Sequence, residues 1–95
     1  MQINFIVCPK NIEQKIEVKH HVSLSEARQA ILNSSRIRFA EREHREGANV
    51  YVAFGQTFVG RYLAVFFIDK PKSTTALIIS ARDMSAKERK TYGKK

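Results

Sequence analysis

The sequence predicts an α+β fold in which helices pack on an antiparallel sheet of about five strands. Three observations lead to this class. From Arg36 onward, apolar residues recur at every second position, which is the period of a β-strand. Two segments begin with Ser-x-x-Glu, the capping box that starts a helix. Short loops join consecutive strands, which favours an antiparallel meander.

The N-terminal part of the chain is predicted to form one strand and two helices. Residues 3–8 (INFIVC) are an apolar run that Pro9 ends, because proline cannot donate a hydrogen bond to a neighbouring strand. Residues 11–20 follow as a helix, with Asn11 as its N-cap. Residues 23–33 form a second helix, which starts with a capping box and stops at a run of Asn and Ser.

The middle of the chain is predicted to consist of strands. They lie at residues 36–39, 50–54, 61–69 and 75–82. A polar loop that contains His44 separates the first two. The third strand is apolar on both faces, which is typical of a central strand that is covered on each side.

A last helix is predicted within residues 85–95, where Ser85 and Glu88 form the second capping box. The complete layout is then β-α-α-β-β-β-β-α. We expect residues 1–95 to make a single domain, because a chain of this length closes only one core.

The chain is strongly basic. Its 95 residues contain 17 Lys and Arg against 9 Asp and Glu, which gives a formal net charge of +8. Such an excess attracts anions and favours an acidic protein or a nucleic acid as the partner. The alternative is that the charge only keeps the protein soluble.

Cysteine usage and hydropathy indicate a cytoplasmic protein. Cys8 is the only cysteine, so no disulfide forms within the chain, and we expect it to be a buried, unreactive thiol. The apolar start is too short for a signal peptide, and no apolar stretch is long enough to span a bilayer.

Two arginines are predicted to meet at one end of the sheet. A hairpin centred between Pro71 and Lys72 places Arg61, the first residue of its strand, opposite Arg82, the last residue of the next. Like charges across a ladder repel, so an anion is expected between them. The basic last helix adds backbone amides at its N-terminus, which favours a phosphate pocket over two solvated arginines.

The remaining polar residues predict catalysis without a metal ion or cofactor. No metal-binding motif, glycine-rich phosphate loop or acyl-transfer motif occurs. His20 lies between the first two helices and is a candidate acid or base, although a histidine at a helix end is more often structural. Positioned cations and a proton carrier suit RNA cleavage by its own 2′-hydroxyl.

Three stretches resemble the BrnT-type toxins of type II toxin-antitoxin systems, within the RelE-like superfamily. They are KHHVSLSEA (residues 19–27), GQTFVGRYLAVFF (55–67) and ISARDMSAKERKTY (79–92). The resemblance implies a ribonuclease, an mRNA interferase that arrests translation. It also implies an antitoxin partner encoded by an adjacent gene, with DNA bound only indirectly through that antitoxin.

At matching positions the resemblance implies catalytic roles for His20, Arg61, Arg82, Glu88 and Tyr92. In this hypothesis the two arginines hold the scissile phosphate, and His20 or Glu88 transfers the proton.

We expect three further cations, Lys19, Arg89 and Lys90, to bind RNA. The sequence departs from the family pattern at His21, where the family usually has glycine, and elsewhere in its N-terminal third. A second hypothesis is therefore a degenerate, non-catalytic homologue that only binds the antitoxin or a nucleic acid.

Overall fold

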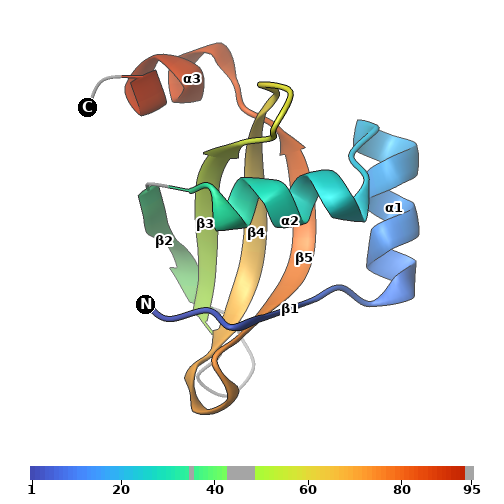
Figure 1. Ribbon diagram of the computed structural model, residues 1–95, viewed down its shortest axis with the longest axis vertical. Coiled ribbons are helices and arrows are strands. Elements are labelled where there is room, and N and C mark those ends of the chain that lie inside the picture. The colour runs from blue at the N-terminus through green and yellow to red at the C-terminus, as the bar shows by residue number, and fades with distance from the viewer. Residues whose placement is uncertain (35, 43–48, 94–95) are drawn as a thin grey trace.

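The computed structural model describes residues 1–34, 36–42 and 49–93, which form three α-helices and a five-stranded sheet (Figure 1). The elements are β1 (Phe5–Val7), α1 (Lys10–His20), α2 (Leu24–Leu32), β2 (Arg36–Arg42), β3 (Asn49–Gln56), β4 (Tyr62–Lys70), β5 (Thr75–Asp83) and α3 (Ala86–Gly93). This order confirms the predicted α+β class and layout. The predicted loop around His44 lies outside the described residues. No helix in these ranges is both long and apolar enough to cross a membrane.

The sheet has the strand order β1-β5-β4-β3-β2. Strands β2 to β5 form the predicted antiparallel meander. β1 runs parallel to β5, so the prediction of an antiparallel sheet is wrong for this strand and the sheet is mixed. Short loops favour antiparallel pairing only between strands that follow each other directly. After β1, the helices α1 and α2 carry the chain to β2 at the opposite edge of the sheet, so β1 can pair in parallel with β5.

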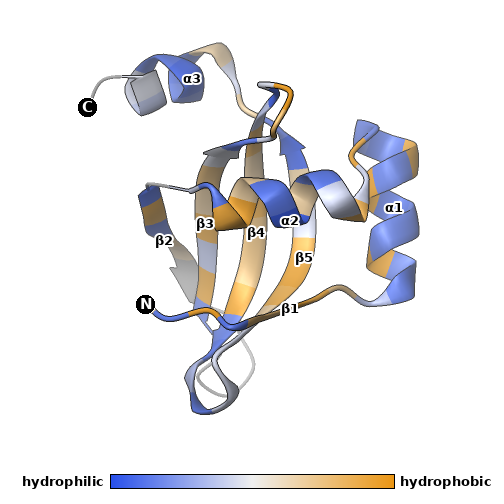
Figure 2. Ribbon diagram, in the orientation of Figure 1, coloured by the Kyte–Doolittle hydropathy of each residue, from blue (hydrophilic) through white to orange (hydrophobic). Residues whose placement is uncertain are grey.

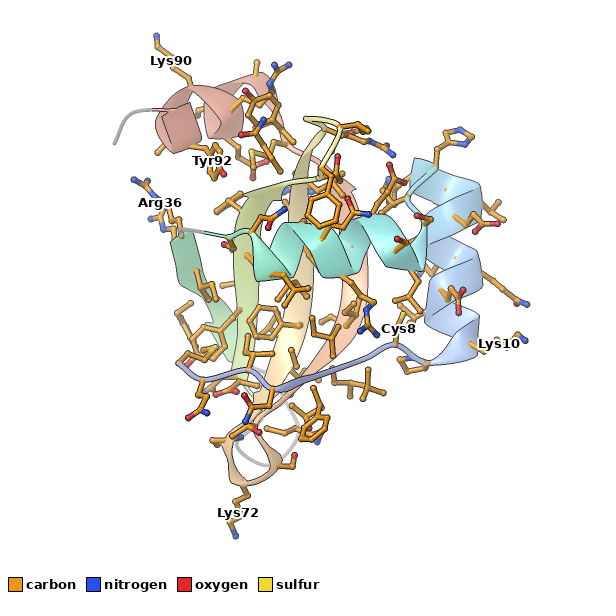
Figure 3. The ribbon with its side chains drawn as sticks, in the orientation of Figure 1. Cys8, Lys10, Arg36, Lys72, Lys90 and Tyr92 are labelled. Atoms are coloured by element: carbon orange, nitrogen blue, oxygen red, sulfur yellow. The ribbon has the colours of Figure 1, made fainter. Side chains whose placement is uncertain are left out.

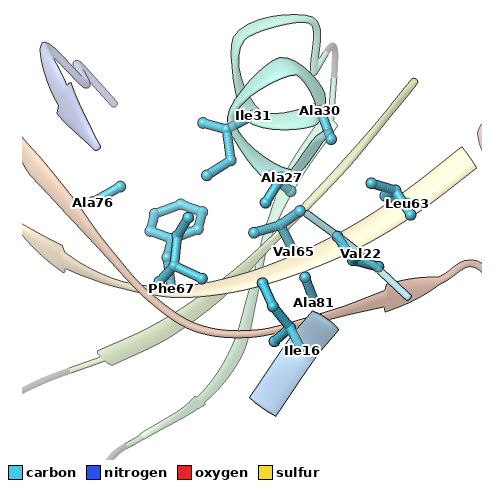
Figure 4. Close-up of a cluster of buried hydrophobic side chains, with 12 residues drawn as sticks. Ile16, Val22, Ala27, Ala30, Ile31, Leu63, Val65, Phe67, Ala76 and Ala81 are labelled. Atoms are coloured by element: carbon cyan, nitrogen blue, oxygen red, sulfur yellow. The ribbon is translucent and has the colours of Figure 1, made fainter. Parts of the chain in front are cut away.

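Helices α1 and α2 cover one face of the sheet, which we call the helix-side face (Figure 1). In Figure 2 the strands beneath α2 are largely hydrophobic, whereas much of the surface of α1 is hydrophilic. Figure 4 shows the core between these layers, which contains Ile16, Val22, Ala27, Ala30, Ile31, Ala53, Leu63, Val65, Phe67, Ala76, Ile78 and Ala81. Burying this apolar surface is the main stabilising contribution to the fold.

Helix α3 packs on the opposite face, which we call the α3-side face. A second buried cluster there contains Val52, Phe54, Ala64 and Met84. The ring of Tyr92 in α3 meets that of Tyr62 in β4 edge to face, with 5.9 Å between the centroids. The early helices α1 and α2 and the late helix α3 therefore lie on opposite faces of the sheet. The buried Met84 side chain, between β5 and α3, joins the cluster opposite α1 and α2.

Both predicted capping boxes are present. Ser23 and Glu26 exchange side chain to backbone hydrogen bonds of 3.0 and 3.1 Å at the start of α2. Ser85 and Glu88 do the same before α3, at 2.8 and 3.1 Å. The predicted N-cap Asn11 is wrong, since α1 begins one residue earlier, directly after a proline, and no side chain caps it.

Replacing Gly55 with alanine tests the contact between α2 and β3. A Cβ atom at this position would lie 2.0 Å from the carbonyl oxygen of Ala30, so the helix would have to move off the sheet. We expect Gly55→Ala to lower the free energy of unfolding by about 3 kcal/mol or more, at the upper end of the cost of overpacking. Urea unfolding followed by circular dichroism measures the change. Gly93→Ala is the control, since a Cβ there meets nothing within 4 Å, and an equal loss in both variants would contradict the account.

Candidate functional site

The β4–β5 hairpin has a different register from the predicted one. Arg82 lies opposite Ala64, three residues along from the expected Arg61. The pairing of Lys70 with Thr75 next to the turn accounts for two residues of this shift, and a bulge further along the hairpin accounts for the third. Because an odd shift moves a side chain to the other face, the predicted meeting of the two arginines across the ladder is wrong. Arg61 belongs to the helix-side face and Arg82 to the α3-side face.

Arg61 is the centre of a polar cluster where β4 and β5 meet the hinge between α1 and α2. Its Nε and Nη2 donate to the carboxylate of Asp83 at 2.8 and 3.1 Å. Nη1 donates to the His21 carbonyl at 2.7 Å and to Glu26 at 3.2 Å, and Nη2 donates to the His20 carbonyl at 3.1 Å. These bonds engage all five N–H groups of the guanidinium. We call this set of residues the hinge cluster.

Two carboxylates already surround the Arg61 guanidinium. The hydrogen bond from Arg61 is the main cause that lowers the pKa of Asp83 below its ordinary value. The pKa of Glu26 is also lowered, chiefly by the backbone hydrogen bond from Ser23 and then by Arg61. Both carboxylates are therefore charged at neutral pH, and they would repel a phosphate brought to Arg61.

The two histidines end α1 within the hinge cluster. His21 is the C-cap residue and has a φ of 54°, in the left-handed region that favours glycine. Both imidazoles act electrostatically to lower the pKa of Asp83. The structure thus brings His20 together with Arg61 on the helix-side face, whereas the other three predicted catalytic residues lie on the α3-side face.

Arg82 and Glu88 form a two-pronged ion pair beneath α3. Nη1 and Nη2 of Arg82 donate to the two carboxylate oxygens at 2.7 and 2.9 Å. The guanidinium also lies over the ring of Phe66, 5.3 Å from its centroid. These bonds, with a further one from the Ser85 amide, lower the pKa of Glu88 to about 2. Glu88 is therefore a carboxylate at neutral pH that fixes the orientation of Arg82.

A cleft opens between α3 and the end of strands β2 and β3. It has a volume of about 130 Å³ and is lined by Arg36, Arg38, Phe54, Lys87, Glu88, Thr91 and Tyr92. We call it the α3 cleft. In Figure 3, Arg36 and Tyr92 lie next to each other below α3. The three cations that line it, Arg36, Arg38 and Lys87, were not among the site residues predicted from the sequence. The alternation Arg-Ile-Arg-Phe, which places both arginines on one face of β2, is the signal that could have found the first two.

The cations predicted to bind RNA do not line the α3 cleft. Lys19 is exposed in the last turn of α1, which packs on the helix-side face, whereas the cleft lies beside α3 on the other face. The guanidinium of Arg89 stacks on the ring of Tyr62, 4.4 Å from its centroid. Lys90 is exposed and points away from the sheet (Figure 3).

The hinge cluster and the α3 cleft differ in their charge balance. Among the described residues, the ion pairs join Arg61 to Glu26 and Asp83, and Arg82 to Glu88. Arg36, Arg38 and Lys87 have no carboxylate partner among the side chains that the structure describes. The α3 cleft therefore carries an excess of positive charge. No group of three or more His, Cys, Asp or Glu residues suited to a metal ion occurs in the described ranges.

The chain matches a known protein family. A family model described as "Ribonuclease toxin, BrnT, of type II toxin-antitoxin system" matches residues 10–88. The matched segment contains His20, Arg61, Arg82 and Glu88, and it ends before Tyr92. No protein in the curated set matches the chain.

The Glu88 ion pair predicts a specific dependence of stability on pH. The pKa of Glu88 is lower in the folded protein than its ordinary value of 4.5. The ionised carboxylate therefore stabilises the fold at pH values above 4.5, and this contribution is lost as the pH falls towards about 2. We expect Glu88→Gln to be less stable than the wild type at pH 7, and the difference to shrink across this interval. Urea unfolding at several pH values measures it. Glu17→Gln, at an exposed position on α1, is the control, and a pH-independent Glu88→Gln difference would contradict the assignment.

His21→Gly is expected to stabilise the hinge. A residue with a side chain pays about 1–2 kcal/mol to adopt the left-handed conformation, and glycine does not. Part of this gain is offset because glycine has more conformational freedom in the unfolded chain. We therefore expect a gain of up to about 1 kcal/mol in the free energy of unfolding, measured by urea denaturation. His20→Gly, inside the last turn of α1, is the control and should destabilise. A loss of stability in His21→Gly would show that the imidazole itself holds the hinge.

Proposed function

The chain belongs to the BrnT family of ribonuclease toxins of type II toxin-antitoxin systems, and on this basis we propose that it cleaves RNA in the α3 cleft without a metal ion. The excess of positive charge in this cleft is the observation that carries the proposal. Cations from β2 and α3 converge there on a space of about 130 Å³. RNA binding depends largely on contacts between such cations and phosphates.

Arg82 is the proposed phosphate ligand next to the cleft. Nη1 and one N–H of Nη2 are occupied by the Glu88 carboxylate and the Asp83 carbonyl. Nε and the second N–H of Nη2 have no partner within the described residues, so they can donate to a phosphate. Arg36 and Arg38 would stabilise the same phosphate from the opposite wall.

In the proposed reaction the 2′-oxygen of RNA attacks the adjacent phosphorus. The bond from phosphorus to the 2′-oxygen forms and the bond to the 5′-oxygen breaks, which leaves a 2′,3′-cyclic phosphate and a 5′-hydroxyl. Water takes the proton from the 2′-hydroxyl and supplies the one that the leaving oxygen needs. The cleft cations stabilise the negative charge that develops on the non-bridging oxygens.

The other predicted catalytic residues take revised roles in this proposal. Glu88, with a pKa of about 2, is too weak a base to accept the proton and instead positions Arg82. The ring of Tyr92 at the cleft wall is suited to stacking on a base. Arg61 and His20 hold the hinge on the other face, so we assign neither of them to the phosphate.

A second candidate function is RNA or antitoxin binding without cleavage. The weak basicity of Glu88 favours it, because this carboxylate is the one acidic side chain that lines the α3 cleft within the described residues. The family implies an antitoxin partner in either case. We propose that any contact with DNA is made through that antitoxin, and that the protein acts in the cytoplasm.

The double variant Arg36→Ala/Arg38→Ala tests the proposal. We expect the rate of RNA cleavage to fall by about a hundredfold, the usual cost of removing groups that stabilise transition-state charge. The assay follows a labelled RNA in excess EDTA and identifies the cyclic phosphate product. Lys10→Ala/Lys72→Ala removes the same charge from exposed positions far from the cleft (Figure 3) and should leave the rate unchanged.

Three outcomes decide between the candidates. Equal loss in both double variants would assign the effect to net charge and contradict a site in the cleft. Cleavage that needs added metal ions would contradict the mechanism. RNA binding without cleavage by the wild-type protein would establish the second candidate function.

A further inference from the structure

The α3-side face carries an exposed apolar surface below the α3 cleft. It contains Phe5, Val7, Phe66, Ile68 and Leu77, and we call it the open face. The register places Val7, Leu77 and Ile68 in one row across β1, β5 and β4. Alternation along each strand directs these side chains away from α1 and α2, because their neighbours Ile6, Ala76, Ile78 and Phe67 pack in the helix-side core.

Two residues of the open face are well exposed. Phe5 is 60% exposed and Val7 is 47% exposed, and the other three residues are only partly buried. Aromatic and aliphatic side chains that are grouped in this way usually mark an interaction site. The surface offers few donors to a phosphate, so its chemistry favours a protein over RNA.

Positive charge lies at both ends of the open face. At its upper end, the Arg82 guanidinium lies over the Phe66 ring and is bonded to Glu88, which lines the α3 cleft with Arg36 and Arg38. Lys70 follows Ile68 on the same face of β4 and is exposed at the lower end. The complementary partner is a segment with an apolar stripe and acidic residues beyond it.

We propose that the open face is the docking surface for an amphipathic, acidic segment of the antitoxin that the family implies. The apolar stripe of this segment covers Val7, Leu77 and Ile68, and its carboxylates enter the α3 cleft. This inference rests on the proposed function, since the carboxylates occupy the space assigned there to RNA phosphate. Antitoxin and RNA therefore exclude each other, which inactivates the toxin without a change of fold.

The double variant Phe5→Lys/Val7→Lys tests the docking surface. We expect the Kd for the purified antitoxin from the adjacent gene, measured by calorimetry, to rise by about tenfold to a hundredfold, as for residues central to an interface. The variant's own RNA cleavage rate should stay unchanged. Val18→Lys/Phe58→Lys is the matched control, because both residues are 77% exposed and lie outside the open face. It should leave the Kd and the cleavage rate unaltered.

The outcomes separate this inference from the proposed function. An unchanged Kd in Phe5→Lys/Val7→Lys, or an equal rise in the control, overturns the docking surface. Loss of RNA cleavage with an unchanged Kd makes the open face an RNA surface and likewise overturns it. If the wild type neither binds nor cleaves RNA, the proposed function fails, and the two Kd values still decide the docking surface. Circular dichroism checks folding, and Val7→Lys alone replaces the pair if Phe5 proves necessary for β1.

Discussion

The guanidinium of Arg61 joins the two halves of the helix-side layer to the end of β4 and β5. It binds the carbonyls that end α1, the carboxylate in the capping box of α2, and Asp83 at the end of β5. Each of these groups would otherwise need water or another partner, because helix ends leave carbonyls without partners. The left-handed turn at His21 brings these carbonyls towards Arg61. Arg61 thereby sets where the helices lie on the sheet, and it has no N–H group left for a ligand.

The alternation of side chains along β5 then decides where the candidate site forms. Asp83 points to the helix-side face, where it neutralises Arg61, and its neighbour Arg82 points to the α3-side face. Arg82 meets Glu88 there, and the capping box before α3 fixes this carboxylate. Two arginines at the same end of one sheet thus have different roles. Arg61 is compensated by two carboxylates. Arg82 is bonded to Glu88, which lines a cleft together with the cations Arg36, Arg38 and Lys87.

Local chemistry explains which parts of the fold the sequence predicted. Both capping boxes and the strand periods depend on residues within a few positions of each other, and they were confirmed. The predicted β4–β5 register was wrong because the register depends on the turn and on one bulge. The pattern of apolar residues along the two strands did not reveal either of them. The parallel pairing of β1 and the position of Arg36 and Arg38 beside α3 depend on contacts between distant segments. The family resemblance indicated Arg82 and Glu88 as functional residues, but it could not show that they are bonded to each other.

The most direct test of the central claim is an NMR titration of the wild-type protein with a short RNA whose 2′-hydroxyls are methylated, so that it cannot be cleaved. Backbone amides and arginine Nε–H groups report where the phosphates bind. We expect the largest shift changes at Arg36, Arg38, Arg82 and the residues of α3 that line the cleft. Changes centred on Arg61, His20 and the hinge between α1 and α2, with α3 and β2 unaffected, would contradict this claim.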